Sequence, residues 1–91
     1  FVWYSKAAEQ GNALAQCNFG ACFYYASGVK QDYVKAVEWY SKSAGLGNAL
    51  AQYSLGVCYY LGQGVKQDYA KAVEWYSKSA EQGNALAQYN L

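Results

Sequence analysis

The chain is built on an internal repeat with a period of 36 residues. The tetrapeptide Trp-Tyr-Ser-Lys begins at Trp3, again at Trp39 and again at Trp75. Two further segments return at the same spacing, namely 11–16 at 47–52 and 83–88, and 28–33 at 64–69. A unit of this length cannot bury its apolar face alone, so the period predicts units stacked into a solenoid.

The second part of each period has the pattern of an amphipathic helix. It begins after Asp32 or Asp68, whose carboxylates suit the N-cap position. Its apolar residues are spaced i, i+3, i+4, i+7 and i+11, as on one side of an α-helix. These residues are Tyr33, Ala36, Val37, Tyr40 and Ala44, repeated as Tyr69, Ala72, Val73, Tyr76 and Ala80. Gly47 and Gly83 follow, where a positive φ is expected to end the helix.

The first part of each period predicts another helix. Asn48 and Asn84 suit its N-cap, and the helix after Asn48 is expected to run from about Ala49 to Leu61. The turn at 62–64 contains two glycines, whereas its equivalent at 26–28 contains one. No Pro interrupts the pattern. The predicted fold is an all-α solenoid of antiparallel helix-turn-helix repeats.

The repeat resembles the Sel-1-like repeat, a relative of the tetratricopeptide repeat. The resemblance is carried by Ala49, Ala51, Gln52, Leu55, Gly56, Tyr59, Gly62, Gly64, Val65, Asp68, Lys71, Ala72, Trp75, Tyr76, Lys78 and Ala80. It implies a right-handed superhelix with repeats at 13–48 and 49–84. Residues 1–12 then form the second helix of a truncated preceding repeat, and 85–91 the start of a following one. Leu14, Leu50 and Leu86 depart from the family, which usually has an exposed polar residue there.

The three cysteines are expected to be free and buried. Cys17 and Cys22 are five residues apart on one predicted helix and point in different directions. Cys22 and Cys58 occupy equivalent places in stacked helices, whose separation exceeds what a disulfide tolerates. The cysteine-rich secreted branch of the family pairs cysteines seven residues apart, and that spacing is missing here. We therefore expect a reducing intracellular compartment.

Charge and composition exclude several classes of function. The chain has seven Lys, no Arg, no His and a net charge of +1. It therefore lacks the basic field that nucleic-acid binding needs and the commonest catalytic base and metal ligand. No apolar run approaches the roughly 18 residues of a membrane span. We expect no enzyme, no cofactor, no metal site, no nucleic-acid partner and no membrane partner.

Several residues are expected to act in packing. Gly20 and Gly56 lie mid-helix, where glycine is unfavourable unless a neighbouring helix approaches closely. Trp39 and Trp75 are expected to pack against the first helix of the following repeat. The i, i+4 pairs Glu38/Lys42 and Glu74/Lys78 are expected to mark the solvated side of the second helix.

The first helix has a second apolar stripe besides the one expected to face the core. A helix that is apolar nearly all round requires cover on both sides. In similar repeats the first helices line the concave surface and contact ligands from these positions. We therefore predict a protein- or peptide-binding groove formed by Leu14, Cys17, Tyr24, Tyr25, Leu50, Tyr53, Val57, Tyr60, Leu61 and Tyr89.

Three alternatives stay open at this point. In the first, part of the stripe packs neighbouring first helices against each other. In the second, the stripe is an assembly surface of a larger complex or homo-oligomer. The assembly alternative fits a chain that starts at Phe1 without Met and is expected to be a piece of something longer, with uncapped ends. An engineered consensus array is the third, although Gly45-Leu46 in place of Glu9-Gln10 resembles natural variation.

Overall fold

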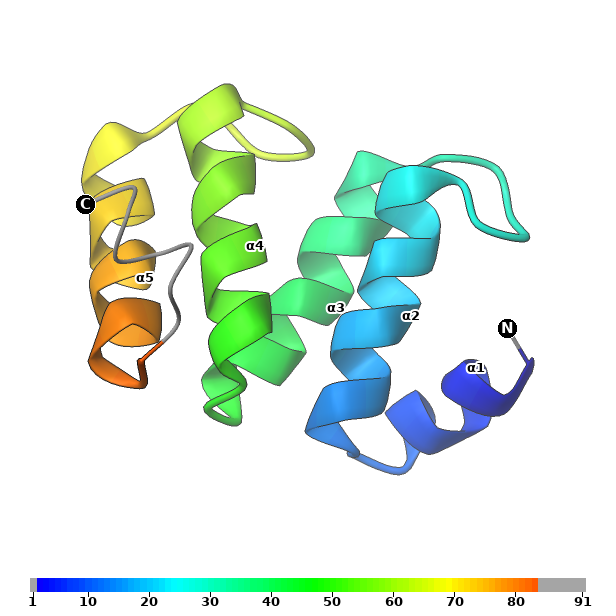
Figure 1. The fold of residues 1–91 in the computed structure, drawn as a ribbon. Coiled ribbons are helices and arrows are strands. Elements are labelled where there is room, and N and C mark those ends of the chain that lie inside the picture. The colour runs from blue at the N-terminus through cyan, green and yellow to red at the C-terminus, as the bar shows by residue number, and fades with distance from the viewer. Residues whose placement is uncertain (1, 84–91) are drawn as a thin grey trace.

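Five helices follow one another along the chain. The structure is a computed structural model that describes the backbone of residues 2–83 and the side chains of residues 6–83. The helices are α1 (Val2–Glu9), α2 (Ala13–Tyr25), α3 (Tyr33–Gly45), α4 (Ala49–Leu61) and α5 (Tyr69–Glu81). Each helix packs chiefly on its neighbours in the sequence (Figure 1). The described residues contain no strand, and the predicted all-α solenoid is confirmed, as is the helix predicted from Ala49 to Leu61.

The N-caps are those that the sequence predicts. The Asp32 carboxylate accepts a hydrogen bond from the backbone N–H of Lys35 at 3.1 Å, and Asp68 does the same for α5. The Asn48 side chain accepts from the backbone N–H of Ala51 at 2.8 Å. These bonds satisfy N–H groups that have no partner inside the helix. The predicted cap at Asn84 lies outside the described residues.

Left-handed residues end the helices. Gly47 (φ 95°) and Gly83 (φ 85°) follow α3 and α5, as predicted, and Gly62 (φ 71°) ends α4. Ala26 takes the place of Gly62 after α2 and also has a positive φ, 58°. The first repeat therefore holds a non-glycine residue in a conformation that favours glycine.

The two glycines in the middle of helices, Gly20 and Gly56, lie where a tyrosine ring crosses the helix. A Cβ atom at Gly20 would lie 3.0 Å from Cδ1 of Tyr40, and one at Gly56 would lie 2.8 Å from Cδ1 of Tyr76. The predicted close approach is confirmed. In Figure 1, α2 and α4 form one layer and α3 lies behind α2, with the core between the layers.

Buried polar side chains join successive helices. The Ser43 hydroxyl donates to the carbonyl oxygen of Ala13 at 2.5 Å and so ties α3 to α2. The Gln52 amide donates to the carbonyl oxygen of Ala44 at 3.2 Å and ties α4 to α3. The first bond connects two helices within a repeat, and the second connects two repeats.

One of these connections is incomplete in the first repeat. The Gln82 side chain donates to Oε1 of Gln52 at 2.8 Å. Its equivalent in the first repeat is Leu46, and Oε1 of Gln16 is buried with no hydrogen-bond partner among the described residues. A buried acceptor without a partner lowers stability.

We expect Leu46→Gln to stabilise the chain by about 0.5–1.5 kcal/mol, because the new amide can donate to Gln16 as Gln82 does to Gln52. Urea unfolding followed by circular dichroism measures the effect. Leu46→Met is the control, since methionine has a similar size and no donor. Equal stability of the two variants would contradict the expected hydrogen bond.

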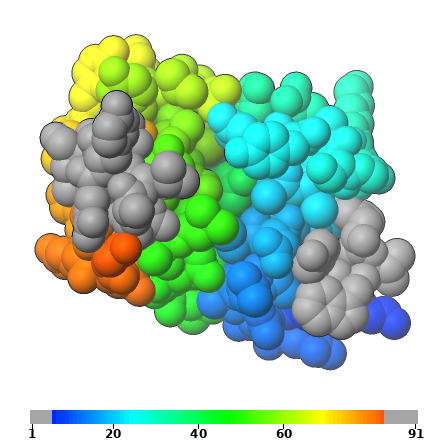
Figure 2. Space-filling model, in the orientation of Figure 1, coloured from blue at the N-terminus to red at the C-terminus, as the bar shows by residue number. Residues whose placement is uncertain are grey.

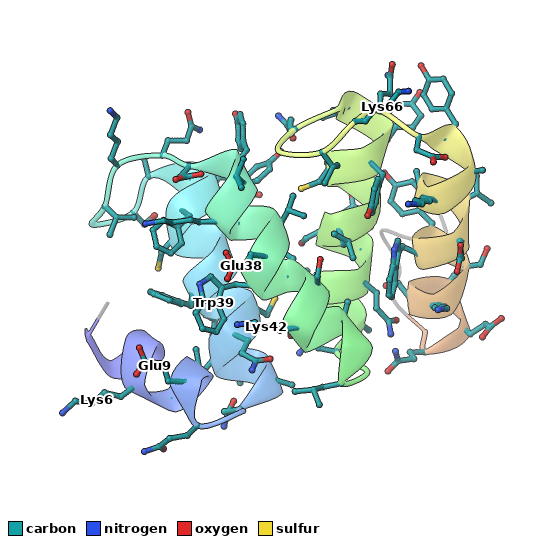
Figure 3. All side chains as sticks on the ribbon, turned by 180° about the vertical axis from the view of Figure 1, so that it is seen from behind. Lys6, Glu9, Glu38, Trp39, Lys42 and Lys66 are labelled. Atoms are coloured by element: carbon teal, nitrogen blue, oxygen red, sulfur yellow. The ribbon has the colours of Figure 1, made fainter. Side chains whose placement is uncertain are left out.

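The second helices α3 and α5 each carry an exposed ion pair. The Glu38/Lys42 pair is 4.0 Å apart and the Glu74/Lys78 pair 3.8 Å, so the predicted i, i+4 pairs are confirmed. Figure 3 shows Glu38, Trp39 and Lys42 together on α3. The Lys42 ammonium lies 4.2 Å from the centroid of the Trp39 ring.

The predicted packing of Trp39 is wrong. The Trp39 ring lies 4.9 Å from the ring of Phe19 on α2, which is the first helix of its own repeat and not of the following one. The reason is the helical spacing, because Trp39 is four residues before Ser43, whose side chain also faces α2. Trp75 stands at the same spacing from Ser79, which bonds to the carbonyl oxygen of Ala49 on α4. The helix against which Trp75 was predicted to pack lies outside the described residues.

Candidate functional site

The first helices of the two repeats, α2 and α4, have no charged residue. The helices α2 and α4 contain no Lys, Asp or Glu. All 7 Lys and all 6 acidic residues lie on α1, α3 and α5 or in the segments that follow α2 and α4. Figure 2 shows α2 and α4 next to each other on one face of the molecule. The charges of the chain are thus segregated from this face.

A hollow lies between α2 and α4, with α3 beneath it. Its volume is about 130 Å³. It is lined by Tyr24 and Tyr25 from α2, Tyr40 from α3, and Tyr53, Ser54 and Val57 from α4. The Tyr24 ring lies 4.8 Å from the ring of Tyr25 and 6.3 Å from that of Tyr40. We call these six residues the tyrosine hollow.

Hydrogen bonds and close packing hold the walls of the tyrosine hollow. The Tyr24 hydroxyl donates to Oε1 of Gln63 at 2.5 Å, which links α2 to the turn after α4. Tyr40 on α3 and Ser54 on α4 both line the hollow. Tyr40 is buried against α2, where the absent Cβ of Gly20 makes room for its ring. The hollow is therefore preformed by contacts between helices.

Burial keeps the polar groups around the hollow neutral. Desolvation raises the pKa of Tyr40 far above its ordinary value and, with a smaller contribution from Cys58, raises the pKa of Tyr24. A phenol is already protonated at neutral pH, and the raised pKa values keep these two protonated at higher pH as well, so their hydroxyls can donate.

Burial also keeps the thiols unreactive. It raises the pKa of Cys17 and of Cys58 to about 11. Because the thiolate is the nucleophile, neither is activated at neutral pH. All three cysteines are free and buried, which confirms the prediction made for them.

Eight of the ten residues predicted for the binding groove fall into two groups. Four of them line the tyrosine hollow: Tyr24, Tyr25, Tyr53 and Val57. Four others are exposed large residues of α2 and α4 outside it: Leu14, Leu50, Tyr60 and Leu61. Cys17 belongs to neither group, and Tyr89 lies outside the described residues.

Cys17 corrects the sequence prediction. It is only 2% exposed and belongs to the core cluster. Its short side chain lies in the core near Tyr40, whereas the larger Tyr53 at the equivalent place in α4 lines the hollow. Periodicity placed both residues on the same stripe, but side-chain length decides which of them reaches the surface.

Tyr40 and Ser54 were missed by the sequence prediction. Tyr40 belongs to the core stripe of the second helix, and Ser54 interrupts the apolar pattern of the first. The available signal was Gly20, because a glycine within a helix indicates that a neighbouring side chain crosses there. That signal points to a ring at the floor of the hollow.

Neither a metal site nor a membrane span is found in the described part of the chain. No three His, Cys, Asp or Glu side chains there come together in a way that could hold a metal ion. None of the helices described combines the length and the hydropathy needed to cross a bilayer.

Comparison with known families and proteins gives one family and no curated relative. The family model described as "Sel1 repeat" matches residues 1–12, 13–48 and 49–84. No curated protein matches the chain.

Three solved structures are similar to this chain over nearly its whole length. The c5321 protective antigen of uropathogenic Escherichia coli, which displays an SLR fold, is 44% identical with a TM-score of 0.93 over 94% of this chain. A Sel1 repeat protein from Oxalobacter formigenes is 40% identical (TM-score 0.95, 98% of this chain), and Helicobacter pylori cysteine rich protein B is 30% identical (TM-score 0.91, 98%). The chain spans 18% of the first protein and 67% of each of the other two.

Proposed function

Because this chain belongs to the Sel1 repeat family, whose members are typically protein-interaction scaffolds, we propose that it is a non-catalytic binding segment. Its ligand is a peptide or a segment of a partner protein, bound on the concave face formed by α2 and α4. The observation that carries the proposal is the uncharged face, which combines the tyrosine hollow with exposed leucines and tyrosines.

The physical chemistry of this face favours a protein ligand. Leu14, Leu50, Tyr60 and Leu61 expose large apolar surfaces on the same two helices, α2 and α4. Each Å² of apolar surface removed from water contributes about 25 cal/mol of favourable free energy. Tyrosines add rigid anchors of the kind that dominate binding energies at protein interfaces.

The test compares two double variants in their binding of peptides selected from a random-sequence display library. Tyr25→Ala/Tyr60→Ala removes two exposed side chains of the face. We expect it to raise the Kd of the selected peptides by about tenfold or more, the scale of lost aromatic anchors. Tyr53 is a poorer target for this purpose, because its ring packs 5.6 Å from that of Tyr76.

The matched control is Val34→Ala/Val73→Ala, which removes two exposed residues of the second helices α3 and α5. Far-ultraviolet circular dichroism confirms that both variants keep their helices. Equal loss of binding in the two variants, or none in either, would contradict binding on the α2/α4 face.

A second candidate role is assembly through stacking. Val73 on α5 is exposed, whereas its equivalent Val37 on α3 is buried in the core cluster. The exposed side of α5 therefore matches a surface that is covered within the solenoid, and a further repeat or another copy of the chain fits it. Light scattering measures self-association. A chain that stays monomeric at all concentrations would exclude the homo-oligomer.

A further inference from the structure

The tyrosine hollow has a composition that selects its ligand. All six lining residues are uncharged, and four of them are tyrosines. The two helices that form its sides contain no charged residue. A carboxylate or an ammonium group entering here would lose its hydration without gaining an ion pair. The part of a ligand that enters the hollow is therefore neutral.

The walls offer aromatic ring faces and hydroxyl groups. A hydrogen bond to Gln63 holds Tyr24, and burial against Gly20 of α2 holds Tyr40, so their rings form fixed surfaces. Tyr25 is 69% exposed and lines the same hollow, which places a phenol at its rim. Phenols are donors to carbonyl oxygens. A fitting ligand brings a compact apolar ring together with unpaired carbonyl groups.

A proline within an extended segment has both properties. The polyproline II conformation has no internal hydrogen bonds and leaves its carbonyls unpaired. Proline has no backbone N–H, so it brings no donor that would need an acceptor in the hollow. Aromatic-lined grooves bind such segments with little loss of conformational entropy, because the segment is already ordered. We propose that the tyrosine hollow receives a proline of an uncharged, extended segment of the partner.

This inference rests on the proposed function and narrows its ligand class. A methylated ammonium group is the other ligand that aromatic faces attract. It has no acceptor for the phenol at the rim, and it carries a charge to a face that has no carboxylate. The observations therefore favour proline, and the methylated ammonium becomes an outcome of the test.

The experiment measures fluorescence anisotropy of three end-capped, fluorescein-labelled peptides of equal length. The first is oligoproline, the second alternates glycine and serine, and the third is the second with one trimethyl-lysine. We expect oligoproline to bind at least about tenfold more tightly than the glycine-serine peptide, and Tyr25→Ala to remove that preference. Tyr69→Ala is the matched control, because Tyr69 is 58% exposed on α5 and does not line the hollow.

Three results would overturn the inference. One is oligoproline that binds no better than the glycine-serine peptide, and another is equal weakening by Tyr25→Ala and Tyr69→Ala. The third is preference for the trimethyl-lysine peptide, which would assign the hollow to a methylated ammonium. If peptides selected from the random library bind the α2/α4 face but lack proline, only this inference fails. If no library peptide binds that face, the proposed function fails as well.

Discussion

Gly64→Ala is expected to lower the free energy of unfolding by roughly 2–5 kcal/mol. Gly64 lies in the turn after α4 with a φ of 74°, where an alanine is strained. Its Cβ would also overlap the carbonyl oxygen of Tyr33 and lie 2.6 Å from the carbonyl carbon. These are backbone atoms at the start of α3, so they cannot rotate away as a side chain could. The turn of one repeat must therefore move off the helix of the repeat before it.

The control for this variant is two residues away. Gly62 has nearly the same φ, 71°, but its Cβ would meet only Gln67, with the Gln67 Cβ 3.3 Å away. The chain itself has Ala26 at the equivalent place. We expect Gly62→Ala to cost about 1 kcal/mol, from the left-handed backbone alone. Urea unfolding measures the free energy of unfolding of both variants. Equal losses of stability would mean that the contact of Gly64 with α3 contributes nothing.

Leu55→Ala is expected to cost about 2–5 kcal/mol, because it removes a core side chain and leaves a cavity. Leu55 is 1% exposed and belongs to the cluster that joins the layers of helices. The same helix offers a matched control in Leu50, which is 46% exposed on the face proposed for binding. Leu50→Ala is expected to change stability far less, by no more than about 1 kcal/mol, and to weaken peptide binding.

The two leucine variants together separate core from surface on α4. Chemical unfolding gives the stability of each, and anisotropy with a selected peptide gives its affinity. If Leu50→Ala destabilised the chain as much as Leu55→Ala, the exposed stripe of α4 would be part of the core. The α2/α4 face would then lose its main support as a binding site.

Much of the fold was predictable because its signals are local. The caps at Asp32, Asp68 and Asn48 act on N–H groups three residues away, and Gly47 ends its helix through its own φ. Such interactions depend on neighbours in the sequence and need no knowledge of packing. Because the sequence repeats, a helix end predicted in one repeat unit could be predicted at the equivalent residue of the next unit.

The candidate site was predictable only in part. Helical periodicity places Cys17 and Tyr53 on one stripe, yet the first is buried and the second lines the tyrosine hollow. Periodicity likewise assigned Tyr40 to the core, without showing that its ring also forms the floor of a hollow between α2 and α4. The direction in which a side chain leaves the helix axis is periodic along the sequence. How far the side chain extends depends on its size and on the helices that pack nearby.

The amino-acid sequence alone determined the repeat unit, the helix ends, the separation of charges from the first helices and the family. These properties follow from residue spacing and from contacts within a few residues. Only the tertiary structure decided that Trp39 packs on Phe19 of its own repeat, that Gly64 lies against the start of α3, and that six residues from three helices enclose the hollow. These contacts join residues distant in the sequence, and the angle and separation at which the helices pack determine them.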